Sequence, residues 1–356
     1  MTQKEMTELN LGQSLDDISN IDPRGYGVSR ILYAGSRGYT QHPLSMNAAK
    51  KLMNDVKQND FTFILTGFVL LPSRKAETDG LVGSVFLAKA LVKAFGARPV
   101  IICPQECMGA IVKMADCTGL DLYTSFGKLP DNSSSIMAAS FTKDIENAFE
   151  FAQDLISQCR PSAVVSVECP GANEVGIYHN SAALNLTEYE AKTDVLFEML
   201  VKAGVTNIAI GDLGNETGMG TIGEHIKKYI PNGEICCCGC GGGICARTKA
   251  DNIITSTVSD WGCYALIAAL AYLKKDLDIL HTAEEEEKVL IAAANNGIID
   301  MCGLEIPCID GFGIDINKTI VNLMRECVDY AIKLEKKCVK WFEMVDNKGF
   351  FNKSII

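Results

Sequence analysis

No apolar run in this chain reaches the ~20 residues that a helix needs to span a bilayer. The opening segment, MTQKEMTELNLGQSLDDIS, is polar and acidic, and lacks both the apolar core of a signal peptide and the Arg-rich pattern of a transit peptide. Lys and Arg number 33 against 44 Asp and Glu, and the net charge of −11 disfavours nucleic acid and anionic membranes as partners. We therefore expect a cytoplasmic protein without a nucleic-acid or membrane partner, and the sequence leaves a homo-oligomer open.

Familiar nucleotide and catalytic signatures are missing as well. The glycines match neither GxGxxG nor a P-loop, so the sequence gives no support for a nucleotide. The four histidines are scattered, and no Ser-His-Asp or Cys-His pattern stands out. Any chemistry is therefore expected to depend on other side chains, acting on a small molecule.

The 15 cysteines would indicate disulfides in a small secreted chain, but this chain is long, and a buried free thiol behaves as a small hydrophobe. The run EICCC at 234–238 predicts a buried strand, and Cys236, Cys237 and Cys238 are expected to form no disulfide. The glycine-rich loop that continues to Cys245 lacks the two separated CxxC pairs of common zinc and iron–sulfur sites. A structural metal or a redox cluster in this loop is the less favoured alternative.

Short apolar segments alternate with helical patterns, in a chain that is 47% hydrophobic and 22% charged. This alternation predicts an α/β three-layer sandwich, with a mostly parallel sheet covered by helices on both faces. Residues 1–20 are expected to form a weakly structured lead, 21–356 a single domain, and 121–140 a polar insertion. Strands are predicted at 61–66, 98–103, 162–168, around 208–210, and at 234–238 and 252–255. Helices are predicted at 44–57, 80–96, 106–116, 142–158, 187–203, 257–274, 283–296 and 318–344.

The stretch TNIAIGDLGNETGMGTIGEHIKKYI at 206–230 contains the densest group of polar and glycine residues. A strand pattern leads into GDLGNETGMG at 211–220, and an amphipathic helix follows. Glycines allow positive φ and close approach of a ligand, and the acids of the loop supply oxygens for a metal or a reacting group. The alternative is a tight turn in which the polar residues only cap the helix. If Glu216 is a base or a metal ligand, Glu216→Gln should impair function and change stability little.

Acidic side chains follow three of the predicted strands, and ligands of such sheets bind beyond the carboxyl ends of the strands. Several carboxylates in one crevice repel one another unless some are protonated or share a cation, so Mg²⁺ or Mn²⁺ is expected, held by Asp212 and Glu216. The alternative is that the first acids only cap a helix. The strand-end residues are Glu77, Thr78, Asp79, Glu168, Asp212, Asn215 and Glu216.

The order of motifs resembles the D-glutamate cyclase family, whose members close D-glutamate to 5-oxo-D-proline. The matching pieces cover about residues 60–311. They are TGF at 66–68, ETDG at 77–80, VSVECPG at 165–171, GIYHN at 176–180, IGDLGNETGMG at 210–220, VSDWGCYAL at 258–266 and GLEIPCIDG at 303–311. The resemblance implies an α/β hydro-lyase that acts on a small amino acid.

The resemblance also implies roles for residues in these motifs. Glu168, Glu216 and Asp212 are expected to be catalytic, with Glu168 or Glu216 as the base. The family's basic residues are replaced by Cys169, Asn173 and Ser181, which leaves Arg74, Lys75 and the helix N-terminus after Gly220 as partners for substrate carboxylates. The alternative function is a non-catalytic binding or sensor protein on the same scaffold. The expected substrate-binding residues are Glu77, Thr78, Asp79, Tyr178, Asn180, Asn215, Gly218, Asp260 and Asp310.

Overall fold

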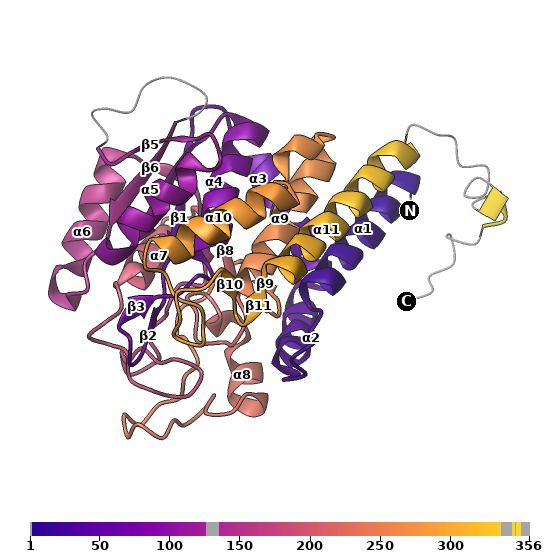
Figure 1. The fold of residues 1–356 in the computed structure, drawn as a ribbon. Helices are drawn as coiled ribbons and strands as arrows, with labels where there is room; N and C mark the ends of the chain where they lie inside the picture. The colour runs from indigo at the N-terminus through magenta and orange to yellow at the C-terminus, as the bar shows by residue number, and fades with distance from the viewer. Residues whose placement is uncertain (1, 126–134, 336–343, 346, 350–356) are drawn as a thin grey trace.

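A seven-stranded sheet lies at the centre of the computed structural model, which describes residues 2–125, 135–335, 344–345 and 347–349 (Figure 1). The strands are Phe61–Thr66 (β1), Arg98–Cys103 (β4), Asp121–Tyr123 (β5), Ser135–Ser140 (β6), Pro161–Val167 (β7), Thr206–Gly211 (β8) and Asn252–Thr255 (β9). Their order is β5-β6-β4-β1-β7-β8-β9, and every pairing is parallel. Two small antiparallel pairs lie apart from it: β2 (Val69–Leu70) with β3 (Lys75–Ala76), and β10 (Cys308–Ile309) with β11 (Phe312–Gly313).

The side chains of each strand alternate between two hydrophobic cores, as the pleat of a strand requires. In β4, Ile101 and Cys103 enter one core, whereas Val100 and Ile102 enter the other. The first core is covered by α1 (Gln3–Ser19), α3 (Leu44–Asp55), α4 (Leu81–Phe95), α5 (Met108–Asp116), α9 (Ser259–Lys274), α10 (Ala283–Asn295) and α11 (Ile314–Glu335). The second core is covered by α2 (Val28–Thr40), α6 (Ile145–Gln158), α7 (Thr193–Lys202) and α8 (Gly223–Tyr229). The predicted α/β sandwich with helices on both faces is therefore confirmed.

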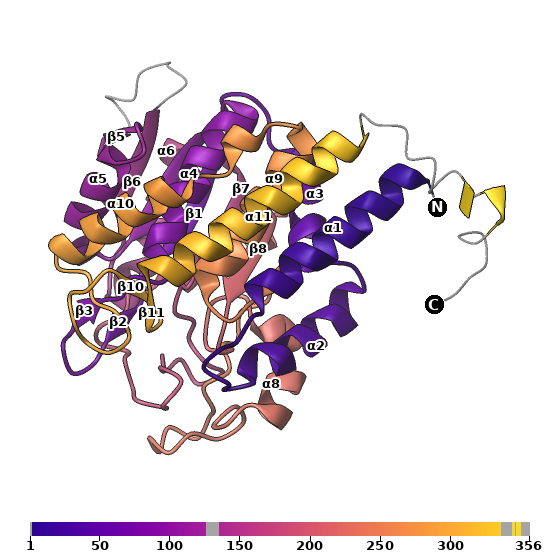
Figure 2. The same ribbon diagram turned by 45° about the vertical axis from the view of Figure 1, so that its right-hand side comes forward.

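Helix α9 is buried on every side from Ser259 to Tyr272. Helices α1, α3, α4 and α11 pack around it, and Figures 1 and 2 show α1 and α11 running side by side. A helix that is apolar on all sides needs such complete cover. Its N-terminus, at Ser259 and Asp260, is consequently fixed in the interior beside the strand ends.

The prediction of a weakly structured lead over residues 1–20 is wrong, because Gln3–Ser19 forms helix α1 with a capping box at its N-terminus. Leu11, Leu15 and Ile18 recur at helical spacing and are buried in the first core. One short apolar stripe gives a weak signal, and the helix takes its stability from packing against α3, α9 and α11. Helix α2 was likewise not predicted.

The predicted strand at 234–238 is also wrong. These residues lie in a loop, where Ile235 is 70% exposed and Cys237 and Cys238 are exposed. The place beside β8 is taken by β9 instead. A short apolar run does not by itself distinguish a core strand from a loop, and glycines follow this one.

The predicted polar insertion at 121–140 contains β5 and β6, which extend one edge of the sheet. Residues 126–134, with most of the DNSSS run, lie outside the described residues. Within the described part of the chain, no helix combines the length and hydropathy needed to cross a membrane.

Candidate active site

The direction in which strands are added to the sheet changes between β1 and β7, which are neighbours in its centre. At such a switch point the loops after the two strands separate and leave a crevice at the carboxyl edge. The loop after β1 carries Glu77, Glu168 directly follows β7, and Asp212 directly follows β8. Parallel pairing thus brings residues that are far apart in the sequence to one edge.

A cavity of about 260 Å³ lies at this edge. Six of the predicted site residues line it, and four of those six are acids. Arg24 is the one Lys or Arg among its described lining residues. The six are Glu77, Glu168, Asn180, Asp212, Asn215 and Asp310.

Glu168 has an unusual backbone conformation, with φ at +43°. A positive φ is disfavoured for a residue with a Cβ and persists only where the surroundings enforce it. Gly80 provides the space, because a Cβ at Gly80 would lie 2.6 Å from that of Glu168. The Glu168 carboxyl is buried, and Ser259 Oγ donates a hydrogen bond of 2.6 Å to its Oε2. The turn therefore holds one carboxyl oxygen in a fixed position at the cavity wall.

Glu216 occupies a different position from the one predicted, beneath the loop and outside the cavity lining. Its carboxylate accepts hydrogen bonds from the backbone N–H groups of Asp212 (2.9 Å), Leu213 (2.7 Å) and Gly214 (2.7 Å). These three N–H donors satisfy the oxygens of the buried side chain. Glu216 consequently holds the loop that presents Asp212 to the cavity.

Asp79 caps α9, the helix that carries Asp260, and Asp260 caps α4, the helix that begins just after Asp79. Asp79 accepts hydrogen bonds from the N–H groups of Ser259 and Asp260 at the start of α9. Asp260 accepts from those of Gly80 and Gly83 at the start of α4. Acceptors at helix N-termini satisfy otherwise unpaired donors, so this pair joins α4 and α9 below the cavity. Asp79 also accepts a hydrogen bond of 2.9 Å from the N–H of Gly80, which directly precedes its own helix.

Three more predicted residues lie outside the cavity lining. Tyr178 Oη donates to Asp194 Oδ1 at 2.5 Å, and Thr78 Oγ1 donates to the carbonyl of Cys308 at 2.7 Å. Gly218 has φ at +94°, and a Cβ there would lie 2.2 Å from that of Ala209. These contacts shape the walls that surround the cavity.

Arg24 and Tyr26 line the cavity from the segment 22–27, and neither was among the site residues predicted from the sequence. Arg24 Nη1 donates to Asp310 Oδ2 at 3.2 Å, and the guanidinium lies over the rings of Tyr26 and Phe312. Asp310 follows Arg24 by 286 residues, so no local pattern could have paired them. The local signal was an arginine between Pro23 and Gly25, two residues before Tyr26.

The expected anion partners lie elsewhere. Lys75 pairs with Glu305, and Arg74 lies over the ring of Tyr189. Two of the three positions that lack the family's basic residues also lie outside the cavity lining, namely Cys169 and Asn173. Ser181 lines it.

Burial dominates the electrostatics of the cavity acids. It raises the pKa of Glu77 well above its usual value, with further increases from Asp310 and Asp79. Burial and then the charge of Glu216 raise the pKa of Glu168, and burial and then Glu168 raise that of Asp212. The cavity acids therefore keep protons at pH values where exposed carboxyls have lost them.

Two groups of buried carboxylates have ligand atoms that lie within 4.8 Å of one another: Asp79, Asp212 and Asp310, and Glu168, Asp212 and Glu216. Asp212 belongs to both, and its buried Oδ1 has no hydrogen-bond partner among the described residues. Oxygen ligands and an unpartnered carboxylate oxygen fit a hard divalent cation. These residues could hold one.

The free energy of unfolding should fall as pH rises above about 4. Unfolded carboxyls lose their protons near that pH, whereas the raised pKa values of Glu77 and Glu168 let the folded state keep them. The folded state thus binds more protons over the window between the unfolded and folded pKa values, and deprotonation there favours unfolding. Urea unfolding at several pH values measures the slope. Glu77→Gln should flatten it, exposed Glu188→Gln should not, and an unchanged slope in Glu77→Gln would contradict this account.

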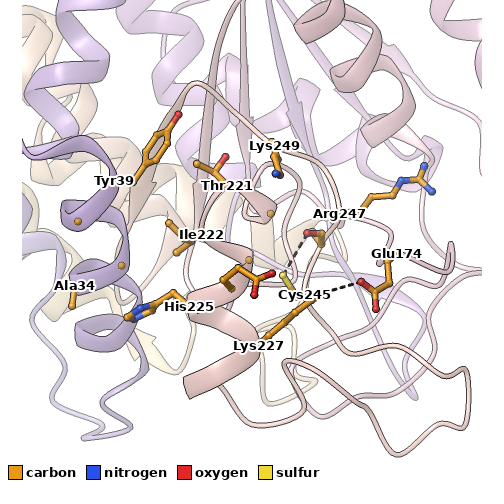
Figure 3. A pocket seen from close by; sticks show the side chains of 16 residues that line it. Ala34, Tyr39, Glu174, Thr221, Ile222, His225, Lys227, Cys245, Arg247 and Lys249 are labelled. Carbon is orange, nitrogen blue, oxygen red and sulfur yellow. Dashed lines mark hydrogen bonds and ion pairs between the residues drawn. The ribbon is translucent and has the colours of Figure 1, made fainter.

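Figure 3 shows a second cavity, of about 590 Å³, between α2 and the segments around α8. It is lined by Lys227, Arg247 and Lys249, and Lys227 pairs with Glu174 at 2.8 Å. The segment 220–223, expected to serve the acidic site, lines this second cavity instead. None of the predicted site residues lines it.

The fold and the site define an α/β protein with a cavity lined by buried acids at the switch point of a parallel sheet. Residues 15–325 match the family model described as D-glutamate cyclase-like, C-terminal, and the chain belongs to that family. A human protein named D-glutamate cyclase, mitochondrial, is 28% identical over 349 residues, covering 89% of this chain and 51% of that protein. The chain thus spans about half the length of this relative. The relative's name places that protein in mitochondria, and the cytoplasmic location expected here stays a prediction.

Proposed function

We propose that this chain is a lyase that interconverts D-glutamate and 5-oxo-D-proline, with loss of water in the direction of cyclisation. The observation that carries the proposal is the cavity at the switch point, where Glu77, Glu168 and Asp212 have raised pKa values beside Arg24. Family membership and the human relative supply the reaction class. The chain spans about half of that relative, so the reaction itself is our inference.

Arg24 is suited to bind the α-carboxylate of the substrate. Its Nε is buried and has no hydrogen-bond partner among the described residues, while its two Nη atoms hold Asp310 and the carbonyl of Thr257. These bonds fix the guanidinium plane, and a fixed guanidinium recognises a carboxylate with little loss of entropy. Asn180 and Asn215 line the cavity and add amide groups for substrate oxygens.

Proton transfer is assigned to the cavity acids. The ammonium of the substrate must lose two protons, and the oxygen that leaves the γ-carboxyl must gain two, so cyclisation releases no net proton. Glu168 accepts a proton from the amine, and its raised pKa brings it closer to the pKa of an amine than an exposed carboxyl would be. The nitrogen then bonds to the γ-carbon and the C–O bond breaks. A protonated neighbour such as Glu77 donates one proton to the departing oxygen, and Glu168 returns the proton that it accepted, so that water leaves. The nitrogen passes its second proton to the Glu77 carboxylate, which restores both acids.

Asp212, with Asp79 and Asp310 or with Glu168 and Glu216, would hold a divalent cation such as Mg²⁺ or Mn²⁺, which polarises a carboxyl group and offsets the repulsion among acids. Without a cation, acids other than Glu168, such as Glu77 and Asp212, must stay protonated to admit a substrate with two carboxylates. Both arrangements keep Asp212 and Asp310 beside the substrate.

Chiral chromatography of reactions with D-glutamate, L-glutamate and both 5-oxoprolines tests the proposal. The metal-free protein and the protein with Mg²⁺ or Mn²⁺ are assayed side by side. We expect interconversion of the D pair alone. Thermal stabilisation by D-glutamate without turnover would instead support the binding-protein alternative, and the absence of both effects would refute the proposal.

A further inference from the structure

A second group of side chains with metal-ligand chemistry lies on the loop that the sequence predicted to be a strand. The imidazole of His179 and the thiols of Cys236, Cys238 and Cys240 have donor atoms within 4.8 Å of one another. His179 Nε2 lies 3.2 Å from the sulfur of Cys238, 3.4 Å from that of Cys236 and 3.7 Å from that of Cys240. The Cys236 sulfur lies 3.1 Å from that of Cys238 and 3.4 Å from that of Cys240.

Hydrogen bonding alone does not account for this group. A neutral imidazole nitrogen offers one lone pair or one N–H, so His179 Nε2 can pair with one sulfur, yet it faces three. A single cation at the centre would be shared by all four donors. Zinc bonds of about 2.3 Å to sulfur and 2.0–2.1 Å to nitrogen give tetrahedral edges of roughly 3.5–3.8 Å. The separations from His179 Nε2 to the three sulfurs, 3.2–3.7 Å, are close to these edges. The two sulfur–sulfur separations, 3.1 and 3.4 Å, are shorter, so the group must open slightly around one ion and is too tight for a cluster of several irons.

The loop brings three alternate cysteine sulfurs together beside His179. Cys236 is buried, Cys240 is half-buried and Cys238 is exposed, and they alternate with the exposed Cys237 and with Gly239. Gly239 has φ at +85°, and the space where a Cβ would lie is open. Glycine is therefore favoured here by the backbone conformation of the turn, and not by a lack of room for a side chain.

Hydrogen bonds around the loop hold two of the four donors, Cys236 and Cys240, in place. The N–H of Cys236 donates to the carbonyl of Gly242 at 2.9 Å and closes the loop. The Gly242 N–H points at the Cys240 sulfur at 3.4 Å, and Asn173 Nδ2 lies 3.6 Å from the same sulfur. Such N–H donors orient ligands and stabilise thiolates at metal sites.

We propose that His179, Cys236, Cys238 and Cys240 bind one Zn²⁺ in a closed structural site. Four protein ligands leave no open position for a substrate, which distinguishes this site from the carboxylate groups. The ion would join two segments separated by 57 residues, the His179 loop and the cysteine loop. The sequence disfavoured a metal here because the loop lacks two separated CxxC pairs, and it gave no reason to group His179 with these cysteines.

The zinc site also supports one wall of the acidic cavity. The carbonyl of His179 accepts a 2.9 Å hydrogen bond from Asn215 Nδ2. Asn215 lines the cavity, and so does Asn180, the residue that follows His179 in the chain. Removing zinc should therefore loosen this wall and raise the KM for substrate, and re-added Zn²⁺ should restore it where Mg²⁺ does not. This consequence rests on the proposed function, whereas zinc binding itself is measured without activity.

Metal analysis of the full chain, purified under reducing conditions, tests the proposal directly. We expect about one zinc per chain. Cys238→Ser and Cys240→Ser should lose most of it. Cys237→Ser, which changes the exposed neighbour, should keep it. Equal loss in Cys237→Ser, or zinc far below one per chain in the unaltered protein, would overturn the proposal.

Cobalt substitution gives a second measurement that needs no variant. After zinc is stripped, Co²⁺ should produce the intense visible bands of a tetrahedral thiolate site, and added Zn²⁺ should abolish them. Weak bands of octahedral Co²⁺, or a Cys236–Cys238 disulfide in the zinc-free protein that excludes the metal, would contradict a Cys₃His site.

Discussion

Replacing Glu168 with glutamine should lower kcat for the D-glutamate reaction by roughly 10²–10⁴-fold, the usual contribution of a general acid or base. Glutamine keeps the shape of the side chain and can still accept the hydrogen bond from Ser259. It cannot take a proton from the substrate amine. Because burial opposes the charged form of Glu168, the neutral variant should fold with unchanged or slightly higher stability.

The measurement is kcat with the melting temperature of the same preparation. Glu188→Gln, on the exposed surface, is the matched control and should change neither quantity. A Glu168→Gln protein that retains its melting temperature and nearly all of its kcat would remove Glu168 from the mechanism. Loss of both quantities would indicate a structural role instead.

Replacing Glu216 with glutamine should lower the free energy of unfolding by about 2–4 kcal/mol. The Glu216 carboxylate accepts three backbone N–H bonds, whereas the amide of glutamine replaces one oxygen with a donor and faces at least one N–H group without an acceptor. The sequence led to the opposite expectation. It treated Glu216 as a base or metal ligand, so that Glu216→Gln should change the stability of the fold little.

Urea unfolding of Glu216→Gln and of Glu224→Gln compares two glutamates close in sequence. Glu224 is exposed on α8 and should tolerate the change. Stability equal to the unaltered protein in Glu216→Gln would show that the three N–H bonds do not hold the loop. Activity should fall as well, since Asp212 depends on this loop for its position.

The sequence predicted five of the seven strands of the central sheet, because strands buried on both faces are continuously apolar. Strand β4, the run RPVIIC, is one such segment, and the predicted range agrees with Arg98–Cys103. Elements that depend on packing were missed. Helix α1 has three buried apolar residues on one stripe, and the helices around it supply the rest of its stability. The EICCC run is the opposite case, an apolar pattern that predicted a strand where none forms. Its residues lie in a loop whose cysteines cluster around His179.

The sequence by itself determined the fold class and the edge of the sheet at which the acids gather, because strand ends and the residues after them are local features. Glu168 and Asp212 were placed there correctly from their positions after β7 and β8. Only the tertiary structure decided what each acid does. Glu216 turned inward to bind three N–H groups, Asp79 capped the helix that carries Asp260, and Arg24 reached Asp310 across 286 residues. Hydrogen-bond partners of this kind are set by distances in space, and chain position does not encode them.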